Sequence, residues 1–164
     1  MPDELAAKPP REIPETTDMS FGLDGSDAGR LELPFRTIAL ERTECEGKCP
    51  IDRVEFHSDG TATYVGEAFV ERTGTFSGEV YLRSFGQLSL MVERVGVMEM
   101  DDRYDAPMTD QPTVIITITP KKGSAKRIED NGGFGPPELW GVEHAILGLM
   151  EQISWIPDAG VDPG

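Results

Sequence analysis

The order of hydrophobic and polar positions divides the middle of the chain into strand-like segments. Apolar and polar side chains alternate in residues 33–42, 53–57 and 61–66, and β-branched residues fill 113–119. Alternation with a period of two is typical of a strand with one buried face. Shorter segments at 72–78 and 125–130 can pair with these strands. The pattern therefore predicts about six strands in a mainly antiparallel sheet.

One turn between two of these strands has a specific signature. Asp59 and Gly60 separate the alternating segments 53–57 and 61–66. Asp-Gly between alternating runs favours a hairpin, because Gly and Asp tolerate the positive φ angles of a type I′ turn. We therefore expect a hairpin with a type I′ turn here.

Two further segments have the spacing of a helix with one buried stripe. Steps of three and four residues join Tyr81, Phe85, Leu88, Val92 and Val95. Ser77 is the expected N-cap of this helix and Gly96 is expected near its end. The second helix is expected to begin at Pro137, because proline is tolerated in the first turn. Its stripe consists of Leu139, Val142, Ile146, Met150 and Ile153.

The order of these segments predicts an α+β fold with two helices packed on one face of the sheet. Residues 1–31 are rich in Pro, Gly, Asp and Glu and have no hydrophobic period. We therefore expect a disordered arm at 1–31, a single α+β domain at 32–156 and a flexible tail at 157–164.

The net charge of the chain limits the kinds of partner that it is expected to bind. The net charge is −15 and the isoelectric point is about 4.4. Such a chain repels phosphate backbones and anionic lipids, so neither nucleic acid nor a membrane is an expected partner. No apolar stretch approaches the length of a membrane span. The first residues lack a signal peptide, so we expect a cytoplasmic protein if Met1 is the native start, and an exported one if the chain has been trimmed.

Several short motifs together resemble a known family. They are Arg42-Thr43 with Cys45, Gly47, Cys49 and Pro50, then Asp59-Gly60, Tyr64 with Gly66, Tyr104, and Thr109-Asp110 with Pro112. Over residues 35–156 the chain resembles a bacterial family known as a domain of unknown function. The resemblance implies one domain and no activity, and it implies that some relatives are exported and lipid-anchored. The family favours an aromatic residue two positions after the Cys-Pro pair, whereas this chain has Asp52.

The two cysteines allow three interpretations. We favour a structural turn formed by Cys45, Gly47, Cys49 and Pro50, with either a disulfide or two small buried thiols. Zinc binding would need further ligands, such as His57 and His144. Thiol redox chemistry would need a lowered thiol pKa, but no helix is predicted after these cysteines.

A second group of candidate residues lies in an acidic loop. Asp101, Asp102, Asp105 and Asp110 surround Tyr104, and close carboxylates can bind calcium or act as acid and base. A solvated loop explains them better, because the spacing of a calcium loop is missing. Trp140 either packs against the sheet or forms an exposed binding surface.

No catalytic motif is found, so we expect a non-catalytic binding or accessory domain without a cofactor. Its partner would be a protein or a small molecule, and its candidate binding surface is Tyr104, Asp105, Asp110 and Trp140. The alternatives are a metal-dependent hydrolase that uses the Asp101–Asp110 loop and a thiol redox protein that uses Cys45 and Cys49.

Overall fold

The computed structural model of the chain describes residues 33–158. The disordered arm predicted at 1–31 lies outside these residues, as does most of the predicted tail. Within them the elements follow in this order: β1 (Phe35–Arg42), β2 (Ile51–His57), β3 (Thr61–Ala68), β4 (Gly74–Glu79), α4 (Leu82–Arg94), the 3-10 helix η1 (Val97–Glu99), β5 (Arg103–Tyr104), β6 (Thr113–Pro120), β7 (Lys126–Asn131), α5 (Pro137–Glu151) and β8 (Ile156–Pro157).

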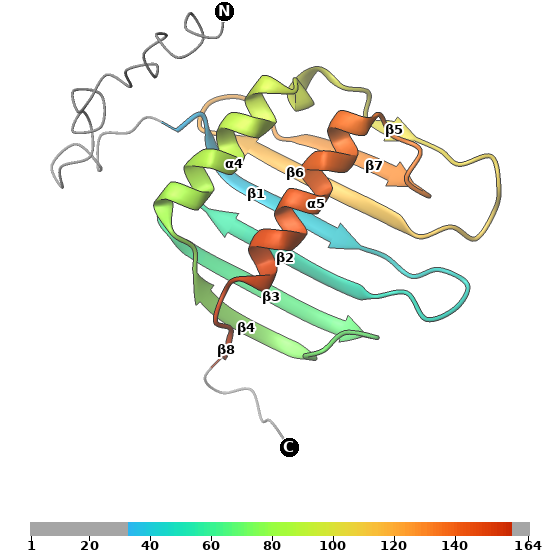
Figure 1. Ribbon diagram of the computed structural model, residues 1–164, viewed down its shortest axis with the longest axis horizontal. Coiled ribbons are helices and arrows are strands. Elements are labelled where there is room, and N and C mark those ends of the chain that lie inside the picture. The colour runs from blue at the N-terminus through green and yellow to red at the C-terminus, as the bar shows by residue number, and fades with distance from the viewer. Residues whose placement is uncertain (1–32, 159–164) are drawn as a thin grey trace, which may run out of the picture. The chain divides into compact units, whose positions relative to one another are not determined.

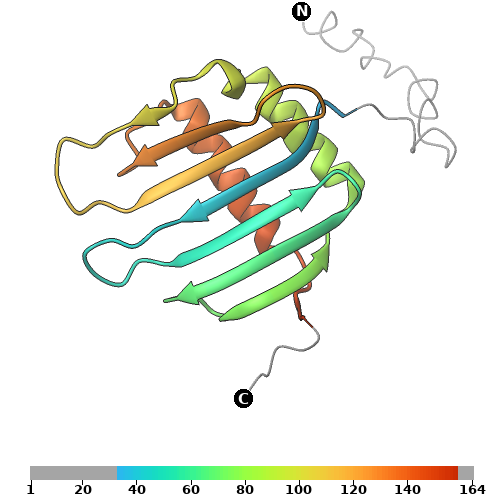
Figure 2. The ribbon, with the colours of Figure 1, turned by 180° about the vertical axis from the view of Figure 1, so that it is seen from behind.

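The strands form one sheet, and both helices cover the same face of it. Its order is β5-β7-β6-β1-β2-β3-β4-β8, and every pair is antiparallel except β5 with β7. Figure 1 shows α4 and α5 in front of the sheet, and Figure 2 shows the opposite, open face. The mainly antiparallel α+β class predicted from the sequence is therefore confirmed.

The predicted count of about six strands is too low, because the sheet has eight. The six longer strands fall where the alternation placed them. The two additional strands, β5 and β8, have two residues each and pair only with the edges of the sheet. A two-residue strand is too short to leave a hydrophobic period in the sequence.

The β2–β3 hairpin exists, but its turn is not of type I′. Of the residues in this turn only Gly60 has a positive φ, of 95°, and the Gly60 amide donates to the carbonyl of His57 at 3.0 Å. A type I′ turn requires positive φ at both central residues. The chain instead has a three-residue loop that ends in a left-handed glycine, while Asp59 accepts a hydrogen bond from the amide of Thr61.

The first helix differs from its prediction at its N-terminal end. Phe85, Leu88 and Val92 are buried as expected, but Tyr81 is 83% exposed and precedes the helix. Ser77 lies in β4 and caps nothing, because β4 continues two residues beyond it. Gly96 adopts a left-handed conformation just past the end of α4, as predicted.

The second helix follows its predicted stripe closely. Leu139, Val142, Ile146 and Met150 are buried on the helix, and Ile153 is buried two residues beyond its end at Glu151. Their partners in the core come from the inward faces of the central strands, including Ile38, Val54, Phe56 and Ile116. The core therefore lies between the two helices and β1, β2, β3 and β6.

Candidate functional site

Four connections meet at one end of the sheet. They are the segments 43–50, 69–73, 105–112 and 132–136, which join β1 to β2, β3 to β4, β5 to β6 and β7 to α5. The antiparallel order of the strands places them together, as Figure 1 shows. We call these four connections the loop end. Most of the motif residues quoted above lie in it or in the strand ends beside it.

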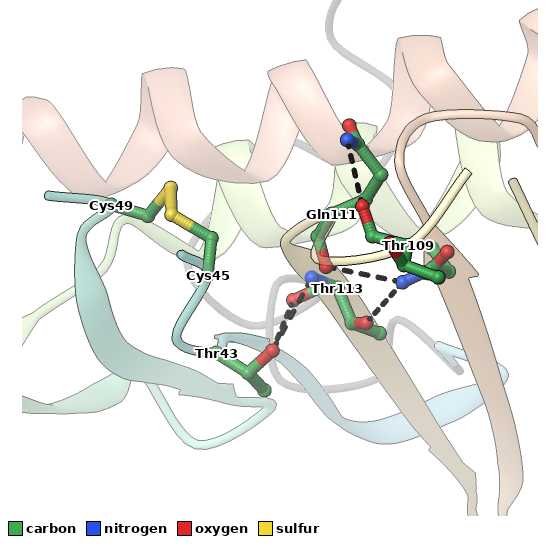
Figure 3. Close-up of a disulfide and its surroundings, with 7 residues drawn as sticks. Thr43, Cys45, Cys49, Thr109, Gln111 and Thr113 are labelled. Atoms are coloured by element: carbon green, nitrogen blue, oxygen red, sulfur yellow. Dashed lines mark hydrogen bonds between the residues drawn. A yellow bond between two sulfur atoms is a disulfide. The ribbon is translucent and has the colours of Figure 1, made fainter. Parts of the chain in front are cut away.

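The two cysteines of the loop end form a disulfide. Cys45 and Cys49 are joined with their Cα atoms 5.8 Å apart, and no free cysteine remains in the chain, which has two (Figure 3). Gly47 between them has a φ of 138°, which L side chains rarely adopt. The disulfide, one of the two forms expected for this turn, is therefore confirmed, and its cysteines are oxidised rather than simply buried thiols.

The disulfide removes the basis of the zinc hypothesis. Metal ligation requires thiolates, which a disulfide lacks. The two histidines also lie apart: His57 pairs with Glu55 on the open face of the sheet, whereas His144 lies on α5 over the other face. Across residues 33–158 no group of three or more His, Cys, Asp or Glu side chains could hold a metal ion.

Hydrogen bonds join the cysteine turn to the loop that precedes β6. The Thr43 amide donates to the carbonyl of Thr113 at 3.0 Å, and the Thr113 amide donates to the Thr43 hydroxyl oxygen at 3.3 Å. Figure 3 shows these threonines beside the disulfide. The motif residue Thr43 therefore connects two loops that are 70 residues apart in sequence.

Asn131 fixes the remainder of the 105–112 loop. Its amide nitrogen donates to the carbonyl of Gln111 at 3.2 Å and to the Thr113 hydroxyl at 3.0 Å. Its amide oxygen accepts a hydrogen bond from the Ala106 amide at 3.2 Å. One side chain at the end of β7 thus holds both ends of the loop, which has few regular hydrogen bonds of its own.

A buried ion pair lies on the inward face of the strands that flank the cysteine turn. The Asp52 side chain is 2% exposed, and Arg42 binds both of its oxygens, with Nε 2.7 Å from Oδ1. The Tyr64 hydroxyl donates to Asp52 Oδ2 at 3.0 Å. The sheet register explains the cluster, since Arg42 is paired with Asp52 across β1 and β2, and Tyr64 follows on β3.

This environment changes the acid–base properties of its members. The hydrogen bonds from Arg42 to Asp52 raise the pKa of Arg42, despite the opposing effect of burial. Burial, followed by the negative charge of Asp52, raises the pKa of Tyr64 above its ordinary value. Arg42 therefore stays charged and Tyr64 stays neutral at neutral pH, which keeps the ion pair and its hydrogen bond from Tyr64 in place.

The structure places the predicted binding-surface residues separately. Tyr104 is half-buried beside the core, and its hydroxyl accepts a hydrogen bond from the Asp101 amide at 3.2 Å. Asp105 pairs with Arg103 at 2.9 Å, and Asp110 is exposed with a φ of 63°. Trp140 is 55% exposed and contacts His144 in a tilted arrangement, with ring centroids 4.1 Å apart.

The acidic residues of the 101–112 segment do not converge. Asp102 pairs with Lys126 at 2.7 Å, while Asp105 is occupied by Arg103. Two of the four carboxylates thus have separate cationic partners, and across residues 33–158 the acidic side chains form no group that could hold a metal ion.

A groove of about 390 Å³ between α4 and α5 contains none of the predicted site residues. Its walls include Leu88, Met91 and Leu149, with Gln87 and Gln152 at its rim. No ionisable side chain lines it. The groove therefore provides no acid–base chemistry.

No helix within residues 33–158 is both long and apolar enough to cross a membrane.

The fold and the loop end together define a one-sheet α+β domain with a disulfide-linked turn. The chain belongs to the family described as domain of unknown function DUF6438, whose model matches residues 36–150. The resemblance to a family of unknown function is thereby confirmed, and no catalytic activity comes with it. No curated protein and no solved structure matches the chain.

Proposed function

We propose that this domain is a non-catalytic binding module and that a partner binds at its loop end. The observation that carries the proposal is the joining of two exposed loops, 43–50 and 105–112, by Thr43, Thr113 and Asn131. Loops held in one conformation lose little entropy on binding, so such a surface binds at lower cost than a flexible one.

The exposed side chains of these loops suit a protein partner. Met108 is 51% exposed, and Lys48 and Asp110 are exposed in the same two loops. Methionine is enriched at the centre of protein interfaces, and charges at the rim guide the approach of the partner. Asp105, beside β5, and Trp140, in the first turn of α5, are exposed but lie apart from these loop side chains.

We further propose that the domain works in an oxidising compartment. Disulfides persist outside the cytosol and are reduced within it. The Cys45–Cys49 disulfide therefore supports export over the cytoplasmic location expected from the first residues.

Site-specific photocrosslinking tests the proposed binding surface. A photoreactive residue replaces Met108 in the loop end or Ser124 in the β6–β7 turn at the opposite end, and the protein is irradiated in an extract of its source cells. The proposal predicts a discrete adduct from position 108 that position 124 does not give. The same adducts from both positions, or none from position 108, would contradict it.

Two measurements test the enzymatic alternatives. Native and denatured masses after incubation with Ca²⁺ or Zn²⁺ are expected to agree, because the acidic side chains of 101–112 do not converge. A stoichiometric metal adduct would favour the hydrolase. Reduction of insulin by the dithiol form is expected to stay at the background rate, because β2 rather than a helix N-terminus follows Cys49.

A further inference from the structure

Two acidic side chains are buried in the core without a cationic partner. Asp130 on β7 is 1% exposed, and Glu143 on α5 is 4% exposed. The third buried acid, Asp52, has Arg42, but no Lys, Arg or His within residues 33–158 forms an ion pair with Asp130 or Glu143. Burying two unpaired carboxylates side by side would be very costly, so their protonation state needs a physical explanation.

A single proton shared by Asp130 and Glu143 explains how both carboxyls can be buried without a cation. Asp130 Oδ2 and Glu143 Oε2 are both buried, and neither has a hydrogen-bond donor among the described residues. The two carboxyls lie within hydrogen-bonding reach of each other, and a proton on one of them satisfies an oxygen of each. Burial, followed by the hydrogen bond to Asp130 and its charge, raises the pKa of Glu143 to about 9. Glu143 is thus the member that carries the proton at neutral pH.

The other oxygen of Asp130 holds the loop in front of α5. Asp130 Oδ1 accepts a hydrogen bond from the Gly135 amide at 2.8 Å. A Cβ atom at Gly135 would lie 2.7 Å from Leu139 Cδ2 and 3.2 Å from Asp130 Oδ2, so any larger residue there would have to displace the buried Leu139 side chain. No side chain caps α5, whose N-cap is Pro136. The Asp130 carboxylate therefore holds the end of the 132–136 segment next to α5, while the Gly132 amide bonds to the Pro112 carbonyl at its start, and the positive end of the helix dipole favours the charge of Asp130.

Within residues 33–158, the elements packed against Asp130 and Glu143 direct no other charged side chain towards them. Asp130 is in register with Val114 on β6 and Tyr104 on β5, so Tyr104 is its one titratable strand neighbour. Arg103 and Glu129 form their ion pair on the opposite face of the sheet. The inward side chains of α4 are uncharged, namely Phe85, Leu88, Ser89 and Val92. The remaining inward side chains of α5 are apolar.

We propose that Asp130 and Glu143 form a binding site for a single proton that latches the 132–136 segment and the start of α5 onto the sheet. With the proton bound, one net negative charge is buried and Asp130 holds Gly135. When the proton leaves, two negative charges repel each other in the core, and α5 moves away from β7 at this end. The 132–136 segment and the first turn of α5 carry two exposed aromatic side chains, Phe134 and Trp140, so loss of the proton rearranges the surface that they form. This inference does not depend on the binding role proposed for the loop end.

Carboxyl NMR of the full chain tests the proton site directly. Wild type is compared with Glu143→Gln, and with Glu138→Gln as a matched control on the exposed first turn of the same helix. One side-chain carboxyl is expected to titrate with a pKa of about 9. This titration is expected to be absent in Glu143→Gln and present in Glu138→Gln. The Gly135 amide resonance is expected to shift over the same pH range in wild type and Glu138→Gln, but not in Glu143→Gln. If no carboxyl titrates in the alkaline range, or if the Gly135 amide does not follow it, the proposal is wrong.

Unfolding equilibria provide a second and independent test. The raised pKa of Glu143 means that folding takes up one proton between the unfolded pKa near 4.5 and the folded pKa of about 9. The stability contributed by this proton is full below the lower value and is lost as pH rises to the upper one. Relative to Glu143→Gln, the unfolding constant of wild type is therefore expected to rise about tenfold per pH unit in this window. Parallel pH profiles of the two proteins would overturn the proposal. If Glu143→Gln fails to fold, Glu143→Leu takes its place, since it also removes the carboxyl that binds the proton.

Discussion

At the scale of single residues, the Arg42–Asp52–Tyr64 cluster accounts for three sequence positions that seemed unrelated. Arg42 and Tyr64 belong to the motifs that carried the family resemblance, and Asp52 stands where an aromatic side chain was expected. The alternation of β1, β2 and β3 predicted strands with one buried face, but neither Arg42 nor Asp52 was predicted to lie on it. Their contact could not be predicted, because it depends on the register that places Arg42 opposite Asp52.

Asp52→Asn is expected to lower the free energy of unfolding by about 2 kcal/mol, because it removes the charge partner of a half-buried arginine. Urea unfolding measures the loss. Glu41→Gln is the matched control, since Glu41 pairs with Arg53 at 3.5 Å on the open face, where both side chains are over 40% exposed. An exposed pair contributes little, so the control is expected to change stability by less than about 0.5 kcal/mol. Equal losses in the two variants would show that the Asp52 pair is no more important than a surface one.

Tyr64→Phe is expected to leave the tyrosinate absorbance of the native protein unchanged up to about pH 11. The reason is that burial and Asp52 keep the Tyr64 hydroxyl protonated there, so it adds nothing to the signal. An alkaline absorbance titration of wild type and variant measures this. A signal that decreases by one tyrosine in the variant would mean that Tyr64 ionises in the folded state.

At the scale of elements, long periodic segments could be predicted and short or irregular ones could not. The six longer strands and the stripe of α5 lie where their spacing placed them. Tyr81 continues the spacing of α4 but precedes the helix, because the chain is still extended there. Strands β5 and β8 depend on edge pairing alone. Gly66 was noted only as part of a motif, and the reason for glycine there is a close approach of the next loop.

Gly66→Ala is expected to destabilise the domain by about 1–3 kcal/mol, because of overpacking. A Cβ atom at this position would lie 2.0 Å from the backbone oxygen of Arg72, so the 69–73 loop must move. The control is Gly148→Ala on α5, where a Cβ atom meets nothing within 4 Å. Removing a glycine from a helix stabilises it by up to about 1 kcal/mol. Thermal or urea unfolding of the pair is expected to give shifts of opposite sign, and shifts of the same sign would refute this explanation of Gly66.

Replacing both Cys45 and Cys49 by alanine is expected to cost about 2 kcal/mol, since the disulfide closes a loop of only five residues. Reductant is expected to lower the stability of wild type by a similar amount and to leave the double variant unchanged. Chemical denaturation with and without reductant measures both effects. If reductant has the same effect on the double variant, the loss does not come from this bond.

At the scale of the whole molecule, the loop end consists of segments that lie far apart in the sequence. Thr43 meets Thr113, and Asn131 meets Gln111, only because β1 pairs with β6 and β6 pairs with β7. Sequence patterns predicted these strands but not their order, so the connections between the loops were missed. Asp130 and Glu143 were missed for a related reason. An acid in a short polar strand and an acid in a helix both resemble solvated residues until the two elements pack together.

The central claim is that the loop end is already rigid before any partner binds. Amide hydrogen exchange tests it most directly, by following the amides of Thr43, Thr113 and Gly132, which donate hydrogen bonds between loops or strand ends. All three are expected to be strongly protected, in contrast to Gly123 in the exposed β6–β7 turn. Exchange of these amides as fast as that of Gly123 would mean that the loops move independently, and the preorganised binding surface would then have to be abandoned.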